Sequence, residues 1–303
     1  KQVKCKRRMF QRIISYYPLL QFIVNGKSLR VLFVALGDLY GCCLLNGERY
    51  MENIVLSLTS YLPRFPTLPP CLASLFSQTV VPDKIILYLD EDASLDQLPI
   101  QVLAFQERGL EIRATPYCLK SHTKYFFAMQ EYPGSIIITV DDDALYEHNL
   151  VENLIRSYQN FPEAVSAGRV HRIRLMSDGR PAPYLEWQHE CTDLRVPSHE
   201  LLATGVGGVL YPPACFGQDA FNRELLLRLS PCADDLWLKV MELRYNIPVV
   251  YAEQNRKHPK TIPGSQENAL YLKNRNEGHN DRYFHQLLNH YQMDIAALFS
   301  TRH

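Results

Sequence analysis

The sequence predicts an α/β fold: one mixed, mainly parallel sheet with helices on both faces. From residue 53 onward, short apolar runs rich in β-branched residues alternate with segments of helical periodicity. This order favours parallel strands joined by crossover helices. Polar residues follow three of the expected strands, at the carboxyl edge where the ligands of such sheets collect.

Each expected element has a local signal. The strand before Asp141 is a buried run of β-branched residues preceded by Pro133-Gly134, and one helix stops at Gly109. No Gly-x-Gly-x-x-Gly follows the first strand, which argues against a dinucleotide fingerprint. The expected strands are 53–60, 84–90, 110–114, 136–140 and one from 164; the expected helices are 71–78, 98–108, 121–132, 149–160 and one starting near 234. Between residues 169 and 197 we expect an antiparallel excursion or loop that covers a substrate.

Composition excludes several classes of protein. The 303 residues suffice for one substantial core or two small ones, and the 47% hydrophobic and 21% charged residues are ordinary. The formal net charge is zero, so nothing points to nucleic acid as a partner. Eight cysteines without a Cys-x-x-Cys pair suggest reduced thiols in a cytoplasmic protein. Neither a signal peptide nor an apolar run of membrane-spanning length is visible.

The first fifty residues differ from the rest, and two domains are expected: a basic, helical extension at 1–50 and a main domain at 51–303. Apolar residues recur at roughly helical spacing after a basic start. One interpretation is an amphipathic helix that lies on the anionic inner leaflet of the plasma membrane. The other is a solvated basic helix whose apolar side packs on the main domain.

Three consecutive carboxylates, Asp141, Asp142 and Asp143, end the buried strand at 136–140. They repel one another and are costly to desolvate, and a hard divalent cation such as Mg²⁺ or Mn²⁺ would relieve both costs. Strand alternation predicts that Asp141 and Asp143 share one face while Asp142 points away. The alternative is an acidic turn that caps the next helix, with Asp143 or Asn149 as the N-cap.

Three further groups are candidates for a site. The glycines between Gly205 and Gly208 permit close approach of a ligand, or they form a plain β-turn. Asp234 and Asp235 open an amphipathic helix, where carboxylates also serve as caps. His258 is either a further metal ligand or a structural histidine.

In this order, several motifs resemble bacterial glycosyltransferases of the GT-A fold, close to family 2. The resemblance covers about residues 53 to 285 and implies a Rossmann-like GT-A domain within 51–303. It rests on Ser57-Leu58-Thr59-Ser60-Tyr61, Pro82-Asp83-Lys84-Ile85-Ile86-Leu87, Thr139-Val140-Asp141-Asp142-Asp143, the glycines at 205–208 and Ala233-Asp234-Asp235-Leu236-Trp237-Leu238.

The resemblance also implies roles for single residues. Asp235 would be the general base, but Asp replaces the usual Glu at 234, which leaves the assignment open between Asp235 and Asp234. The implied metal ligands are Asp143 and Asp141, of which Asp143 is the stronger candidate. His258 is added as a third ligand from the residues alone. The residues implied to bind the nucleotide or donor are Thr59, Ser60, Asp90, Lys124, Asp141, Asp142, Gly207 and Gly208.

These roles describe a metal-dependent hexosyltransferase that moves a sugar from a nucleotide-diphosphate donor, with UDP favoured. A divalent cation (Mn²⁺ or Mg²⁺) stabilises the diphosphate leaving group, and one carboxylate takes the proton of the acceptor hydroxyl. A single base opposite the leaving group predicts inversion at the anomeric carbon. The expected acceptor is a glycan or a lipid-linked saccharide in the synthesis of surface polysaccharide, lipopolysaccharide or capsule.

Two other functions fit the same pattern. A sugar-nucleotide nucleotidyltransferase also pairs such a sheet with acidic metal ligands, although no glycine- and lysine-rich triphosphate loop follows the first strand. A non-catalytic carbohydrate-binding protein on the same fold is the other alternative. Carboxylates kept at both acidic motifs argue against it, because an inactive site need not keep them.

Overall fold

The computed structural model describes residues 52–255, 258–265 and 278–300, and all of these except Glu52 belong to a unit that begins at Asn53. The prediction for residues 1–50, including the membrane contact, lies outside the described residues.

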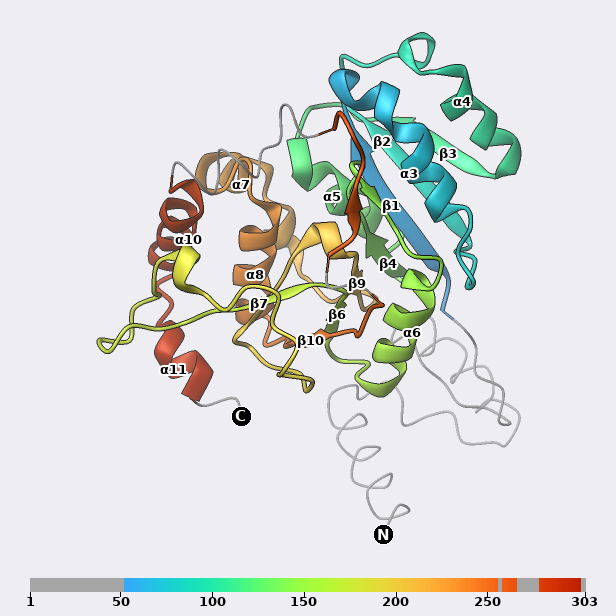
Figure 1. Cartoon of the computed structure of the whole chain (residues 1–303). Helices are drawn as coiled ribbons and strands as arrows, with labels where there is room; N and C mark the ends of the chain where they lie inside the picture. The colour runs from blue at the N-terminus through green and yellow to red at the C-terminus, as the bar shows by residue number, and fades with distance from the viewer. Residues whose placement is uncertain (1–51, 256–257, 266–277, 301–303) are drawn as a thin grey trace, which may run out of the picture. The chain divides into compact units, whose positions relative to one another are not determined.

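The centre of this unit is a seven-stranded sheet (Figure 1). All neighbouring strands are parallel except β9, which runs antiparallel to both of its neighbours, β4 and β6. The predicted mixed, mainly parallel sheet is therefore confirmed. In spatial order, the strands are β10 (Val249–Tyr251), β6 (Val165–Ala167), β9 (Val209–Tyr211), β4 (Ile136–Thr139), β1 (Ile54–Ser60), β2 (Lys84–Leu89) and β3 (Leu110–Ala114).

Helices cover both faces of the sheet because successive side chains of each buried strand point to opposite sides. In β1, Leu56 and Leu58 join one apolar cluster, whereas Val55 joins the other. The first cluster includes α3 (Leu68–Leu75), α4 (Ile100–Leu103) and α6 (Leu150–Asn160); the second includes α5 (Thr123–Glu131), α7 (Arg223–Leu229), α8 (Asp234–Arg244), α10 (His279–His290) and α11 (Ile295–Ser300).

Two helices differ from the prediction at their ends. Helix α3 begins at Leu68, three residues early, because prolines are tolerated in the first turn, where their missing N–H groups have no intrahelical partner. The helix expected at 98–108 is α4 followed by a 3₁₀ helix, Ala104–Arg108. It ends as predicted at Gly109, whose φ of 99° is the left-handed conformation that glycine adopts readily.

The segment between β6 and β9 leaves the sheet and returns to it at the same edge. Ala167, the last residue of β6, lies opposite Val209, the first residue of β9, and Gly168 N–H donates to Gly208 O at 2.9 Å. Within this excursion, β7 (Val170–Arg172) pairs antiparallel with β8 (Leu201–Ala203), which lies beyond the predicted end at residue 197. Because β9 is reversed, the glycines that precede it lie at the carboxyl edge of the sheet.

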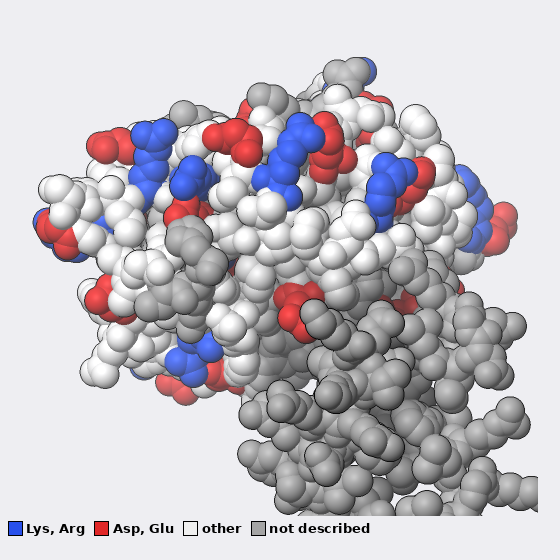
Figure 2. All heavy atoms as spheres, turned by 90° about the horizontal axis from the view of Figure 1, so that it is seen from below, with Lys and Arg blue, Asp and Glu red and all other residues white. Residues whose placement is uncertain are grey.

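Surface charge is mixed in sign. Figure 2 shows Lys and Arg interspersed with Asp and Glu on the face that it presents, in keeping with the zero net charge.

Among the helices of the described residues, none combines the length and the apolar character needed to cross a membrane.

Candidate active site

The two acidic motifs, almost one hundred residues apart in sequence, meet at Lys124. Its Nζ lies 2.6 Å from Asp141 Oδ1 and 2.9 Å from Asp234 Oδ2. Lys124 is in the first turn of α5, and its carbonyl accepts a hydrogen bond from the Ser57 hydroxyl of β1, which ties this turn to the sheet. The convergence on which the sequence interpretation depends is therefore present.

Lys124 remains charged although it is buried. Burial lowers the pKa of its ammonium group, but the charges of Asp141 and Asp234 outweigh that effect, and the net pKa is raised well above the usual value. A buried cation between carboxylates of two separate motifs fixes their spacing, since removing it would leave unpaired charges in a low dielectric.

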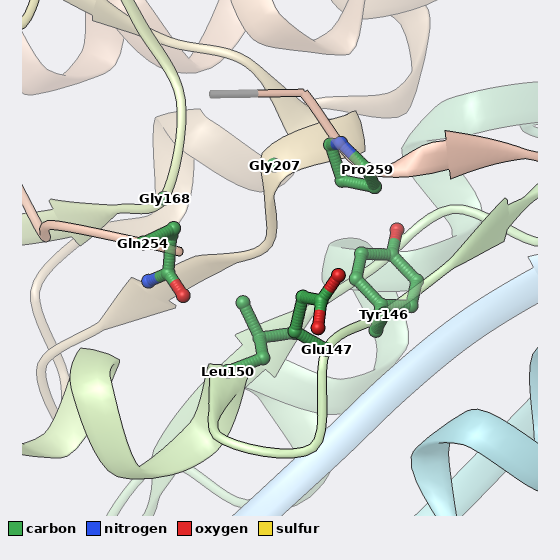
Figure 3. A pocket seen from close by; sticks show the side chains of 7 residues that line it. All are labelled: Tyr146, Glu147, Leu150, Gly168, Gly207, Gln254 and Pro259. Carbon is green, nitrogen blue, oxygen red and sulfur yellow. The ribbon is translucent and has the colours of Figure 1, made fainter. Parts of the chain in front are cut away.

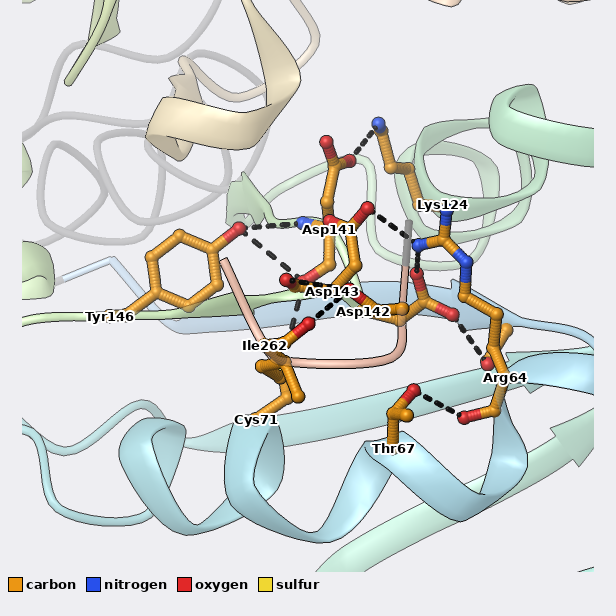
Figure 4. A network of polar contacts seen from close by, with 11 residues as sticks. Arg64, Thr67, Cys71, Lys124, Asp141, Asp142, Asp143, Tyr146 and Ile262 are labelled. Atoms are coloured by element: carbon orange, nitrogen blue, oxygen red, sulfur yellow. Dashed lines mark hydrogen bonds and ion pairs between the residues drawn. The ribbon is translucent and has the colours of Figure 1, made fainter. Parts of the chain in front are cut away.

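The acidic triplet is arranged differently from the predicted alternation. Strand β4 ends at Thr139, so the triplet lies beyond the strand and period-two alternation no longer applies. Asp142 and Asp143 share Arg64, whose Nη1 lies 2.7 Å from an oxygen of each, whereas Asp141 turns to Lys124 (Figure 4). The pairing of Asp141 with Asp143 on one face was therefore wrong.

Backbone contacts hold the triplet rigidly. Asp141 N–H donates to the Tyr146 hydroxyl at 2.8 Å, and Ile262 N–H donates to Asp143 O at 2.9 Å. Next to Asp143, β5 (Ala144–Leu145) pairs with β11 (Lys260–Thr261). Asn149 does occupy the N-cap position of α6, but its side chain makes no capping hydrogen bond. The triplet is thus a separate rigid turn and does not cap the helix.

Asp234 and Asp235 are neighbours with opposite environments. Burial acts to raise the pKa of Asp234, but the charge of Lys124 outweighs burial and lowers it. For Asp235, burial and then the charge of Asp234 raise the pKa to about 8. Asp235 is also the more exposed of the two, and its Oδ1 accepts a hydrogen bond from Gly205 N–H at 3.0 Å. Such separation of two pKa values is typical of acid–base sites.

The glycine loop, Gly205–Gly208, faces this cluster through its first glycine. A Cβ on Gly205 would lie 2.7 Å from Lys124 Nζ and 3.3 Å from Asp235 Oδ1. The equivalent space at Gly207 is filled by Arg169 of the protein itself, and Gly208 adopts a φ of 77° beside Leu150. Gly205 is therefore the glycine closest to the chemistry, although the sequence prediction chose Gly207 and Gly208.

The residues expected to hold the nucleotide follow β1 and β2 at the same edge. Ser60 donates to Asp142, and the Thr59 hydroxyl donates to Tyr88 O at 3.1 Å. Asp90 accepts from the Cys118 thiol at 3.2 Å through Oδ2, while its Oδ1 is buried without a hydrogen-bond partner among the described residues. Burial raises the pKa of Asp90. This orphaned oxygen is an acceptor in need of a donor.

His258 does not join the acidic triplet. Its exposed ring places Nδ1 2.7 Å from Pro259 O, and it makes no contact with Asp141 or Asp143 among the described residues. Over the same residues, no three His, Cys, Asp or Glu side chains are already positioned as a metal site. The predicted three-residue metal shell is not assembled, because Arg64 and Lys124 hold the carboxylates instead.

Two hollows lie outside this cluster. Figure 3 shows one behind the glycine loop, lined by Tyr146, Leu150, Gly207 and their neighbours; its volume of about 20 Å³ fits one water molecule and no sugar. A larger hollow of about 540 Å³ is lined by Arg223, Glu224, Leu227 and Arg228, none of which belongs to the acidic cluster.

Sequence reasoning missed two members of the site. Arg64 lies in a proline-containing 3₁₀ helix after β1, and the available sequence signal was a basic residue shortly after the end of that strand. Tyr146 was part of the acidic stretch, but nothing in the pattern showed that its hydroxyl would return to the Asp141 backbone.

A mainly parallel sheet with one reversed strand and with carboxylates gathered at its carboxyl edge matches the predicted Rossmann-like GT-A fold. The sequence model described as "Glycosyl transferase family 2" matches residues 60–217, just over half of the chain. The chain therefore belongs to glycosyl transferase family 2 and is a glycosyltransferase. This membership favours transfer over nucleotidyl synthesis or binding alone. No curated protein sequence matches the chain.

Solved structures with low sequence identity resemble it. A mannosyltransferase from Pyrobaculum calidifontis, in complex with GDP-Man and Mn²⁺, has 15% identity and a TM-score of 0.49, covering 87% of this chain and 72% of its own. TarS residues 1–349 of S. aureus, in complex with UDP, has 15% identity and a TM-score of 0.44, covering 83% and 75%. With scores this low, family membership rests on the sequence match.

Proposed function

We propose that the protein is a metal-dependent, inverting glycosyltransferase that moves a sugar from a nucleoside-diphosphate donor, UDP-linked by preference, to a hydroxyl of a glycan or lipid-linked saccharide. The supporting observation is the meeting of two acidic motifs at Lys124. Surface polysaccharide, lipopolysaccharide and capsule of a bacterium are the acceptors that we would test first.

The balance of charge supports a divalent cation. Among the described residues, the carboxylates of Asp141, Asp142, Asp143 and Asp234 form ion pairs with two cations, Lys124 and Arg64, and Asp235 lies beside them. Burial, and to a smaller extent the charges of Asp143 and Asp141, raise the pKa of Asp142 to about 6 in spite of Arg64. An anionic diphosphate would be repelled from such a site unless a further cation accompanied it.

The residues present fit a hard cation in their chemistry, because carboxylate oxygens are the ligands that Mg²⁺ and Mn²⁺ prefer. Asp143 and Asp141 would hold it, once Arg64 releases Asp143. When bound, the cation would act as a Lewis acid that stabilises the leaving diphosphate. Lys124 adds a fixed positive charge at the same edge, and Thr59, Ser60 and Asp90 are proposed to bind the nucleoside part of the donor.

Asp235 is the proposed general base. A base must be reachable by the acceptor hydroxyl and must accept a proton near neutral pH. Asp235 is the more exposed acid of its pair and has its pKa raised to about 8, whereas Asp234 is held ionised by Lys124. Gly205 N–H orients the Asp235 carboxylate. Asp234 is then the residue that positions Lys124.

Stereochemistry of the product tests this proposal. One base on the acceptor side, with no second carboxylate proposed as a nucleophile, gives direct displacement and inversion at the anomeric carbon. The anomeric configuration of the product of UDP-glucose, and of other UDP-sugars if UDP-glucose is not a donor, is to be determined by NMR. A product with retained configuration would remove Asp235 from the role of base.

A further inference from the structure

Arg64 neutralises two carboxylates of the triplet with a single nitrogen. Its Nη1 lies 2.7 Å from Asp142 Oδ1 and 2.7 Å from Asp143 Oδ2, and its side chain is only 11% exposed. Burial acts to lower the pKa of its guanidinium group, but the charges of Asp142 and Asp143 outweigh burial and raise it. Arg64 is therefore a permanent cation inside the acidic cluster.

The backbone presents Arg64 to the triplet from a rigid element. Arg64 lies in a 3₁₀ helix, Leu62–Thr67, between Pro63 and Pro66, whose rings fix φ on both sides of it. Its N–H donates to Tyr61 O at 2.8 Å, and its carbonyl accepts from the Thr67 hydroxyl at 2.9 Å (Figure 4). The Cα of Arg64 is thus fixed, and any change of partner must come from rotation of its side chain.

The present contacts leave part of the guanidinium unsatisfied. Arg64 Nε is buried and has no hydrogen-bond partner among the described residues. Both carboxylates are reached through Nη1. A guanidinium group offers five donors in a planar fork that matches phosphate oxygens in pairs. A diphosphate could accept hydrogen bonds from guanidinium N–H groups, such as Nε–H, that do not bond to Asp142 or Asp143.

We propose that Arg64 is an internal counter-cation. In the free enzyme it competes with the divalent cation for Asp143, and it turns to the diphosphate when the donor binds. The two positive charges cannot share one carboxylate oxygen at contact distance without strong repulsion. This inference rests on the proposed function, because it assumes a cation at Asp143 and a diphosphate beside it.

A coupling between metal and nucleotide follows from this competition. The free enzyme binds the cation weakly, because Arg64 must first be displaced. When UDP binds, Arg64 contacts its diphosphate and releases Asp143, so the cation binds more tightly. By reciprocity, the cation tightens UDP binding by the same factor. An enzyme with this device takes up metal and donor together.

The coupling can be measured without turnover. Mn²⁺ is titrated into the purified protein, followed by EPR, with and without UDP. In wild type we expect weak binding of Mn²⁺ that UDP tightens. In Arg64→Gln we expect Mn²⁺ to bind roughly 5- to 150-fold more tightly without UDP, and the further tightening by UDP to be smaller than in wild type by the same factor.

Two further variants control this experiment. Arg156→Gln removes an exposed arginine paired with Glu152 on α6 and should behave as wild type. Arg64→Lys keeps a positive charge near Asp143 and should keep the weak Mn²⁺ binding, provided that thermal melting shows both Arg64 variants to be folded. A folded Arg64→Gln protein with the Mn²⁺ affinity of wild type would overturn the proposal. Inversion and EDTA-sensitive turnover are separate readouts, so failure of the proposed function is recognised independently.

Discussion

At the scale of single residues, two adjacent aspartates of the site have different surroundings and therefore different pKa values. Asp234 contacts a buried ammonium group, and its neighbour Asp235 contacts only a backbone N–H among the bonds described for it. The pKa of Asp234 is lowered, and that of Asp235 is raised to about 8. Helix geometry explains the difference, because adjacent residues on α8 point about 100° apart and meet different surroundings.

The activity of Asp235 should depend on pH. Only the ionised carboxylate accepts a proton, so kcat of the wild type should rise with pH and level off above about 8 if the free-enzyme pKa persists in the complex. Asp235→Asn removes the base and should lower kcat by roughly 10²- to 10⁴-fold. Steady-state kinetics from pH 5.5 to 9.5 would measure both effects. A variant with the turnover of wild type would exclude this assignment.

Folding stability should respond to pH in the opposite sense. The raised pKa means that, between the unfolded value near 4 and about 8, the native protein binds a proton at Asp235 that the unfolded chain has lost. The free energy of unfolding contributed by this group is therefore fully present below pH 4 and is lost as pH rises through 8. Urea unfolding of the metal-free protein at pH 6, 7 and 9 would show it, and Asp235→Asn should flatten this part of the profile.

At the scale of elements, the glycine loop leaves no room for a side chain at Gly205. The Cβ of alanine at 205 would lie 2.7 Å from Lys124 Nζ, so the ammonium group would have to move away from Asp141 and Asp234. The end of a lysine side chain is flexible, so the fold should survive while the site is displaced.

Gly205→Ala should accordingly reduce turnover by roughly 10²-fold, the effect of misplacing catalytic groups by about 1 Å, with little change in the melting temperature. Gly134→Ala is the matched control, because a Cβ there meets nothing within 4 Å and its turnover should match wild type. Kinetics and thermal melting of both variants separate a local effect from loss of folding. Equal turnover in the two variants would contradict the placement of Gly205.

Most elements were predictable because their signals are local. The strand at Leu110–Ala114 was predicted to the residue, since Gly109 precedes it and Thr115-Pro116 follows it. The pairing inside the site was not predictable. Which acid meets Lys124 and which meets Arg64 depends on β4 ending at Thr139, and no local pattern marks that residue as the last of the ladder. The role of Arg64 depends on a contact across 78 residues of sequence.

At the scale of the whole molecule, the site joins elements from β1 to β11, so ligand binding should stabilise the entire unit. UDP and Mn²⁺ together, each at about 100 times its Kd, should raise the melting temperature by roughly 10–20 °C. Differential scanning fluorimetry with each ligand alone and with both would test this. Asp143→Ala should lose the Mn²⁺-dependent part of the shift, and Asp178→Ala, in an exposed pair with Arg180, should keep it. A full shift in Asp143→Ala would exclude Asp143 as a ligand.

The reversed strand β9 has one more consequence. Ala167 and Val209 pair on adjacent strands, so residues 168–208 form an excursion that leaves and rejoins the sheet at the same edge. The excursion is also bonded to the rest of the unit: Ser198 and Val249 of β10 exchange two backbone hydrogen bonds, and Lys239 Nζ donates to Leu201 O at 2.7 Å. Close to β9, Gly205 N–H donates to Asp235 Oδ1. Substitutions in this excursion are therefore expected to disturb the sheet edge at β10 and the surroundings of Asp235 together.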